Sequence, residues 1–145
     1  NLIIIGSYDN HQIYYRNNLK KASTKNITFM ENVNHKILLD LYSNCKGFIT
    51  TASDEDFGMT VVEAMASGKP VIAPNEGGYK ETVINNKTGI LIEDINEDKI
   101  IEAINKINKE LKNNPEKYKT ACINQAKKFD TKIFIKKIKD EIDLK

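Results

Sequence analysis

The chain has 145 residues, of which 40% are hydrophobic and 29% are charged, and its formal net charge is +2. This length and composition suffice for one compact domain with a core, and the small net charge gives no reason to expect a nucleic-acid partner. The sequence holds no apolar run long enough to cross a bilayer. Cys45 and Cys122 lie far apart and form no metal-binding or redox spacing, so we expect reduced thiols in a cytoplasmic protein.

Short apolar runs alternate with segments of helical periodicity along the first two thirds of the chain. Each run has the length of a buried strand, and the segments between the runs carry apolar residues three or four positions apart. The predicted strands cover residues 2–5, 27–30, 47–50, 71–73 and 90–92. The predicted helices among them cover residues 11–23, 35–45, 60–67 and 79–84.

The last third of the chain is predicted to be helical. Apolar residues from Ile100 to Leu111 mark one helix face, which Asn113-Asn114-Pro115 ends. A helix over about residues 116–129 follows, and Asp130 or Thr131 can cap a last helix. Strands that alternate with helices predict an α/β fold: a Rossmann-like parallel sheet with helices on both faces, ending in C-terminal helices.

In such a sheet, ligands bind beyond the C-terminal ends of the strands, where the loops 51–59 and 74–78 are expected to lie. Glu55 and Glu63 are separated by seven residues and flank the start of a predicted helix. Amides at a helix start attract anions, and carboxylates accept hydrogen bonds from hydroxyls. We therefore expect a phosphorylated, hydroxyl-rich ligand at this end of the sheet.

The local sequence leaves two interpretations of Glu63 open. The segment Thr60-Val61-Val62-Glu63 matches a capping box, in which the glutamate accepts a hydrogen bond from the amide at the N-cap. Alternatively, Glu63 faces the ligand and binds a pair of hydroxyls. The 2′ and 3′ hydroxyls of a ribose are the natural pair for one carboxylate.

The acidic triplet Asp54-Glu55-Asp56 also has more than one interpretation. It can be a solvated loop, or a metal site in which hard carboxylates hold Mg²⁺ or Mn²⁺. We favour a site without a metal, because the helix N-terminus that follows can neutralise phosphate itself. Gly58 lets a backbone come close to a ligand, and Gly77-Gly78 predicts either a tight turn or a second bare backbone facing the site.

A set of short motifs, densest between residues 41 and 91, is specific as a set although no single member would be. These motifs are Leu41-Tyr42-Ser43-Asn44-Cys45-Lys46, Asp54-Glu55-Asp56-Phe57-Gly58, Glu63-Ala64-Met65-Ala66, Gly68-Lys69-Pro70-Val71-Ile72-Ala73, Gly77-Gly78 with Glu81-Thr82-Val83, and Thr88-Gly89-Ile90-Leu91. Together they resemble the C-terminal, donor-binding domain of a family 4 glycosyltransferase with the two-domain GT-B fold. The first two motifs are most similar to the mannosyltransferase branch of that family.

The resemblance implies a retaining transfer of a hexose, with mannose and GDP-mannose favoured over other sugars and nucleotide sugars. It implies that Glu55 contacts the donor sugar and acts in catalysis, and that Glu63 binds the ribose. The base would lie against Asn32 and Val33. The other substrate-binding residues that it implies are Asp56, Phe57, Gly58, Met59 and Thr60, whose segment would hold the diphosphate, and Gly77 with Gly78, which would shape the sugar pocket.

The resemblance also implies partners. No cofactor or metal is expected, and an N-terminal domain would bind the acceptor, which is a glycan or a lipid-linked sugar. We expect that domain to be missing, since the chain opens directly on a strand at residues 2–5 without an initiator methionine. The arginine and lysine with which this family clamps the diphosphate would precede that strand, so we expect this piece alone to bind donor weakly and to be inactive.

Two alternatives stay open at this point. The chain could belong to another GT-B enzyme, such as a sugar-nucleotide epimerase, or it could be a non-catalytic nucleotide-binding α/β module.

The lysine-rich C-terminal end is most simply a solvated helix face, and its alternative is a peripheral contact with the inner face of a membrane.

Overall fold

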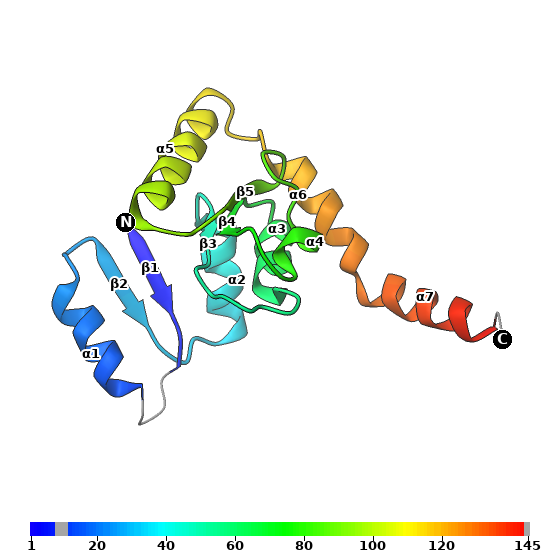
Figure 1. The fold of residues 1–145 in the computed structure, drawn as a ribbon, viewed down its shortest axis with the longest axis horizontal. Helices are drawn as coiled ribbons and strands as arrows, with labels where there is room; N and C mark the ends of the chain where they lie inside the picture. Colours follow the sequence, from blue (N-terminus) through cyan, green and yellow to red (C-terminus); the bar gives the residue numbers. More distant parts are fainter. Residues whose placement is uncertain (8–11, 144–145) are drawn as a thin grey trace. The chain divides into compact units, whose positions relative to one another are not determined.

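The computed structural model describes residues 1–7 and 12–143 of the chain. The chain divides into two compact units, Asn1–Asp40 and Leu41–Lys145, each with its own parallel strands (Figure 1). The five predicted strands are all present, and every pair that they form is parallel, as the alternation of strands and helices predicted.

The first unit holds a pair of strands and the helix that connects them. β1 (Leu2–Ile5) pairs in parallel with β2 (Ile27–Met30), and Leu2 lies opposite Ile27. α1 (Ile13–Ala22) forms the crossover that a parallel pair requires. These elements confirm the predicted strands and most of the predicted helix, whose first residue, 11, lies outside the described residues.

The predicted burial of β1 is wrong. Leu2, Ile3 and Ile5 are 44%, 45% and 40% exposed. Successive residues of a strand point to opposite faces of its sheet, so Ile3 and Ile5 share one face and Leu2 lies on the other. One crossover helix can cover only one face of a two-stranded sheet, and a unit of this size leaves much of its apolar surface in water.

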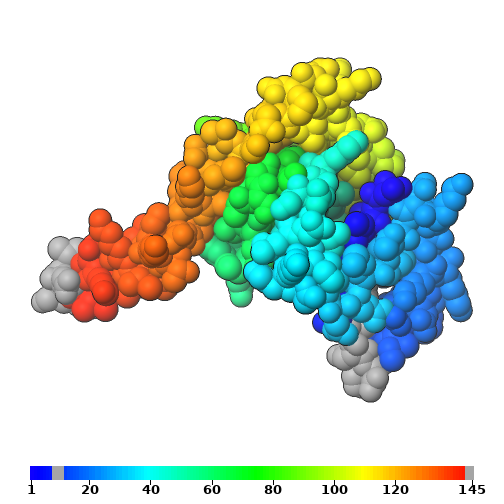
Figure 2. Space-filling model, turned by 180° about the vertical axis from the view of Figure 1, so that it is seen from behind, coloured from blue at the N-terminus to red at the C-terminus, as the bar shows by residue number. Residues whose placement is uncertain are grey.

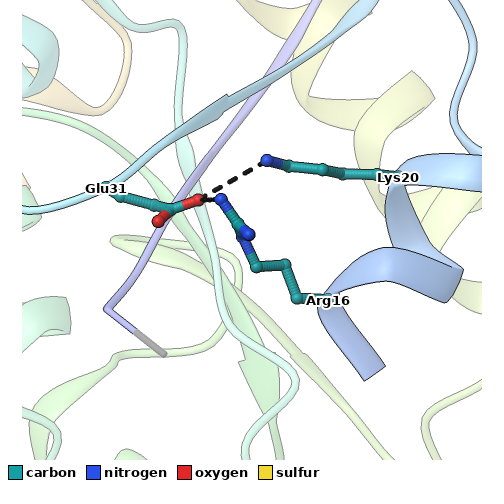
Figure 3. Close-up of polar contacts among 3 residues, drawn as sticks. All are labelled: Arg16, Lys20 and Glu31. Atoms are coloured by element: carbon teal, nitrogen blue, oxygen red, sulfur yellow. Dashed lines mark hydrogen bonds and ion pairs between the residues drawn. The ribbon is translucent and has the colours of Figure 1, made fainter. Parts of the chain in front are cut away.

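A cluster of charges joins α1 to the end of β2. Arg16 and Lys20 lie one helical turn apart on α1, and both donate to the carboxylate of Glu31 (Figure 3). The Lys20 Nζ to Glu31 Oε1 distance is 3.5 Å. All three side chains remain partly exposed, so the cluster orients the helix more than it stabilises the unit.

The second unit is built on a three-stranded parallel sheet in the order β3-β4-β5. These strands are β3 (Phe48–Ile49), β4 (Val71–Pro74) and β5 (Gly89–Ile92), and Val71 pairs with both Phe48 and Gly89. β4 is central, and all four of its residues are buried. Burial on both faces explains why this strand is a continuous apolar run in the sequence.

Helices cover both faces of this sheet. The helices of this unit are α2 (His35–Asn44), whose last residues belong to it, α3 (Met59–Ala66), α4 (Tyr79–Thr82), α5 (Glu97–Asn113), α6 (Lys119–Ala126) with the 3-10 turn η1 (Lys127–Phe129), and α7 (Thr131–Asp143). α7 contacts η1 and extends away from the sheet (Figure 1). α3 and α5 both pack on β4, and α6 packs along α3. In Figure 2 the orange segment, which includes α6, lies against the green one. Across residues 1–7 and 12–143, none of the helices has the length and apolar character needed to cross a membrane.

Helix boundaries follow local hydrogen bonds. The helix predicted over residues 116–129 begins only at Lys119, because a turn over residues 115–118 comes first and the Lys117 N–H donates to Asn114 O at 3.1 Å. The last helix is capped by Asp130 as predicted, since its carboxylate accepts a hydrogen bond from the Lys132 N–H at 2.8 Å.

The N-cap of α5 provides a test of the second unit's stability. Asn96 Oδ1 accepts from the Lys99 N–H at 3.0 Å, so Asn96→Ala should lower the free energy of unfolding by about 1 kcal/mol. Urea denaturation would measure it. Asn105→Ala, an exposed change in the interior of the same helix, is the matched control and should leave stability unchanged or slightly higher. An equal loss in both variants would contradict the capping role of Asn96.

Candidate functional site

The loops that follow the three strands of the second unit meet at the C-terminal edge of its sheet. They enclose a hollow of about 200 Å³. Its lining residues are Thr51, Ser53, Pro74, Asn75, Glu76, Ile92, Glu93, Asp94 and Ile95. This edge is where open α/β sheets bind ligands, and it carries the acidic loop and the glycine loop that the sequence singled out.

Two hydrogen bonds donated by backbone amides hold the acidic loop against the glycine loop. The Gly78 N–H donates to the carbonyl oxygen of Glu55 at 2.9 Å. In the other direction, the Asp54 N–H donates to Glu76 Oε1 at 3.1 Å. Asp54 itself lies in the left-handed region, with φ at 56°. The loop that carries Glu55 is therefore positioned by the loop after β4, which comes about 20 residues later in the chain.

The glycine pair is required by this contact. A Cβ atom on Gly78 would lie 2.4 Å from both Asp56 O and Phe57 Cα, and one on Gly77 would lie 2.4 Å from Glu55 O. Gly77 also has a φ of 46°, as the predicted tight turn requires. Gly78 is buried against the acidic loop. Any influence of Gly78 on a ligand pocket therefore acts through the backbone of residues 55–57.

The half-buried carboxylate of Glu55 lies at the start of α3. Its Oε1 accepts a hydrogen bond from the Gly58 N–H at 3.0 Å. Phe57, in the same loop, packs its ring edge-on to that of Phe129 at a centroid distance of 5.5 Å. Within the described part of the chain, the second carboxylate oxygen of Glu55 accepts no hydrogen bond from protein. This oxygen can accept one from a ligand hydroxyl.

The capping-box interpretation of Glu63 is wrong. Gly58 is the N-cap residue of α3, with φ at 78°, so Thr60 is the second residue of the helix and Glu63 the fifth. A capping box needs the glutamate at the third helical position. The left-handed glycine starts the helix earlier than predicted, and the carboxylate of Glu55 takes the amide that a capping glutamate would take.

Glu63 instead meets a tyrosine from α2. Tyr42 Oη donates to Glu63 Oε2 at 3.1 Å and lies 3.4 Å from the carbonyl oxygen of Thr60. Tyr42 is buried, and its ring packs at an angle on that of Phe48. Burial, and then the charge of Glu63, raise the pKa of Tyr42, so the phenol stays protonated and acts as a donor. No feature of the sequence pointed to this pair, because Tyr42 lies on an apolar helix face.

The first turn of α3 offers amides to an anion. The Val61 and Val62 N–H groups return to Gly58 O at 3.0 and 3.2 Å. Over the described ranges, the N–H groups of Met59 and Thr60 have no protein acceptor, as is usual for a first helical turn. Together with the positive end of the helix dipole, these two amides are donors at the place where the sequence predicts an anion, residues 57–60, and the binding itself stays a prediction.

Asn32 and Val33, the residues expected at a nucleotide base, belong to the first unit, whereas the other predicted site residues belong to the second. They follow β2 at the C-terminal end of its parallel pair, and Asn32 has a φ of 50°. Each unit therefore places its predicted ligand-binding residues at the same end of its own strands.

No metal-binding geometry emerges at the acidic triplet. Among residues 1–7 and 12–143, no group of three or more His, Cys, Asp or Glu side chains is arranged to hold a metal ion. The amide of Asp54 is used in the contact with Glu76, and Glu55 is turned to the Gly58 amide.

A larger hollow, of about 820 Å³, lies at the opposite, N-terminal ends of β3 and β4. Lys46, Lys69, Lys112 and Lys119 line it, together with residues near the C-terminal ends of α2, α3 and α5. Lys46, Lys69 and Lys112 lie near helix C-termini, where lysines interact favourably with the carbonyl groups. Lys119 begins α6 and pairs with Glu116. This hollow shares no residue with the loops of the candidate site.

The close contact at Gly78 can be tested by one methyl group. Gly78 has a φ of −63°, which alanine adopts without strain, so any effect of Gly78→Ala must come from the contact with residues 56–57. We expect a loss of roughly 1–3 kcal/mol in the free energy of unfolding. Gly47→Ala is the control, because its nearest atom would lie 3.1 Å away, and it should cost less. Equal stability of Gly78→Ala and wild type would contradict the contact.

The sequence of this chain is similar to those of known proteins. A family model described as glycosyl transferases group 1 matches residues 1–129. The chain is 34% identical over 143 residues to the alpha-1,3/1,6-mannosyltransferase ALG2 of Dictyostelium discoideum, covering 93% of this chain and 33% of that protein. It is 37% identical over 71 residues to the GDP-mannose-dependent alpha-(1-6)-phosphatidylinositol monomannoside mannosyltransferase of Mycobacterium tuberculosis, covering 48% of this chain and 18% of that protein.

A solved structure shows the same fold. The crystal structure of Anabaena HepE in complex with UDP and glucose matches with a TM-score of 0.78 at 24% identity, covering 99% of this chain and 40% of that one. The chain thus spans about a third of the length of the Dictyostelium relative. The match over residues 1–129 is decisive for the family, and it confirms the predicted resemblance. This chain belongs to the glycosyl transferases group 1 family.

Proposed function

We propose that this chain is the donor-binding domain of a retaining glycosyltransferase that moves a hexose from a nucleotide-diphosphate sugar to a glycan or a lipid-linked acceptor. The observation that carries the proposal is the family match over residues 1–129. Mannose is the proposed sugar and GDP-mannose the proposed donor, because the two relatives described above are named as mannosyltransferases and one of them as GDP-mannose-dependent. An N-terminal domain that binds the acceptor is proposed for the rest of the protein.

The start of α3 suits the diphosphate. The amides of Met59 and Thr60 and the helix dipole provide donors and positive potential for an anion. The Gly58 amide is not among these donors, since Glu55 accepts from it. Because the amides are fixed before the ligand arrives, they also favour the negative charge that builds up on the diphosphate as it leaves. We propose that this arrangement works without a divalent metal.

The two glutamates are proposed to serve different parts of the donor. Glu63 is exposed on α3 and accepts hydrogen bonds from the hydroxyls of the ribose. Glu55 keeps one oxygen on the Gly58 amide and turns the other to the hydroxyls of the sugar. Its negative charge also stabilises the positive charge that develops on the sugar as the bond to the diphosphate breaks.

The nucleotide can be identified by titrating the full-length protein with GDP, UDP and ADP, once with EDTA present and once with Mg²⁺ or Mn²⁺ in its place. We expect GDP to bind best, and we expect Glu63→Gln to weaken its binding roughly tenfold to a hundredfold through the loss of a charged acceptor. Glu102→Gln, an exposed change on α5, is the matched control and should bind like wild type. A preference for UDP would overturn the GDP-mannose proposal, and binding that needs Mg²⁺ or Mn²⁺ would overturn the metal-free one.

The role of Glu55 is tested by Glu55→Gln in the full-length enzyme. Glutamine keeps the oxygen that accepts from the Gly58 amide, so the loop should stay in place while the negative charge is lost. Because the charge acts mainly in the transition state, we expect kcat to fall by about a hundredfold or more, with little change in GDP affinity. An unchanged kcat with a collapse of GDP binding would show that Glu55 is a nucleotide ligand, and an inactive wild-type enzyme that binds GDP would favour the non-catalytic module.

A further inference from the structure

Glu63 is an exposed glutamate whose orientation is set by a buried residue. Among the described residues, its carboxylate has no ion-pair partner, and its hydrogen bond comes from Tyr42 Oη at 3.1 Å. We propose that Tyr42 is a positioning residue for the donor nucleotide: its phenol holds one oxygen of Glu63 so that the other meets the ribose hydroxyls. This inference rests on the proposed function of Glu63.

Tyr42 is well placed to act as a fixed point. It is 6% exposed, and its ring lies against Phe48 with a centroid distance of 6.0 Å. The second acceptor near its hydroxyl, Thr60 O at 3.4 Å, belongs to the first turn of the same helix as Glu63. The phenol therefore ties α2 to the start of α3, and an acceptor that carries a charge makes the Glu63 bond the stronger of the two.

The chemistry of the group also suits a permanent donor. A phenol has one proton to donate, and burial together with the Glu63 carboxylate raises the pKa of Tyr42. The phenol therefore keeps its proton at neutral pH and donates it to Glu63. The acceptor atom that remains, Oε1, has no protein donor in the part of the chain that the structure describes.

Fixing the carboxylate has a consequence for recognition. A free glutamate on a helix surface samples several rotamers, and binding a ligand would freeze them. A glutamate that is already held loses less freedom, so the same hydroxyls bind it more tightly. This gain in affinity requires the ribose hydroxyls, because the free oxygen of Glu63 has no other group of the nucleotide to accept from. Tyr42 should therefore sharpen the preference for a ribonucleotide over one that lacks the 2′ and 3′ hydroxyls.

The test compares GDP with 2′,3′-dideoxy-GDP, or the corresponding uridine pair if UDP binds better, on the full-length protein. Tyr42→Phe removes the hydroxyl and keeps the ring. We expect it to weaken GDP binding about threefold to tenfold, to leave dideoxy-GDP binding unchanged, and to raise the KM for donor with little effect on kcat. In a Glu63→Ala background, Tyr42→Phe should have no further effect.

Tyr118→Phe is the matched control. Tyr118 is buried and donates to the carboxylate of Glu110, so the variant makes the same chemical change in another tyrosine–glutamate pair. Tyr118 lines the larger hollow at the far end of the strands, and we expect its variant to bind both nucleotides like wild type. Melting temperatures of both variants separate loss of stability from loss of recognition.

The outcomes distinguish a failure of the ribose role of Glu63 from a failure of the positioning role of Tyr42. If wild type binds GDP and dideoxy-GDP equally and Glu63→Ala binds as wild type does, the ribose role of Glu63 fails, and the inference fails with it. If wild type prefers GDP and Tyr42→Phe keeps that preference in full, Tyr42 is not a positioning residue although Glu63 binds ribose. Equal weakening of both nucleotides by Tyr42→Phe would assign Tyr42 a structural role and overturn the inference.

Discussion

The candidate site depends on one close contact between two backbones. Residues 55–57 lie directly on Gly77 and Gly78, so closely that a single Cβ would fall 2.4 Å from backbone atoms. The Gly78 N–H fixes the carbonyl of Glu55 in the same contact. Because neither loop is part of a helix or strand, this contact is what gives the acidic loop a defined position. The direction of the Glu55 side chain and the start of α3 both follow from it.

The carboxylates of Glu55 and Glu63 have the same chemistry but are held by different kinds of hydrogen-bond donor. Glu55 is held by the backbone amide of its own loop, which is a short and local hydrogen bond. Glu63 is held by the phenol of Tyr42 from another helix. A local partner depends only on the conformation of the loop, whereas a phenol from α2 is present only when α2 and α3 are packed together. The orientation of Glu63 therefore depends on the packing of the whole unit.

Much of the fold could be predicted because its signals are local. The strand Val71–Pro74 is continuous and apolar since it is buried on both faces, and the helix Glu97–Asn113 shows its apolar stripe and its C-terminal end in the sequence. The candidate site was predicted less well. The capping box failed because the left-handed Gly58 moved the helix start, and a left-handed conformation at a glycine is allowed by the sequence but not required by it.

The sequence by itself determined the succession of strands and helices along the chain, the parallel pairing of the strands, and the family, because periodicity, strand length and motif spacing are properties of the chain alone. Tertiary structure decided which groups meet. It placed Gly78 directly against Phe57, brought Tyr42 into contact with Glu63, which lies 21 positions away in the sequence, and left Leu2 and Ile3 exposed to water. Such contacts depend on how separate elements pack, and the sequence pattern of one element does not specify which other element lies against it.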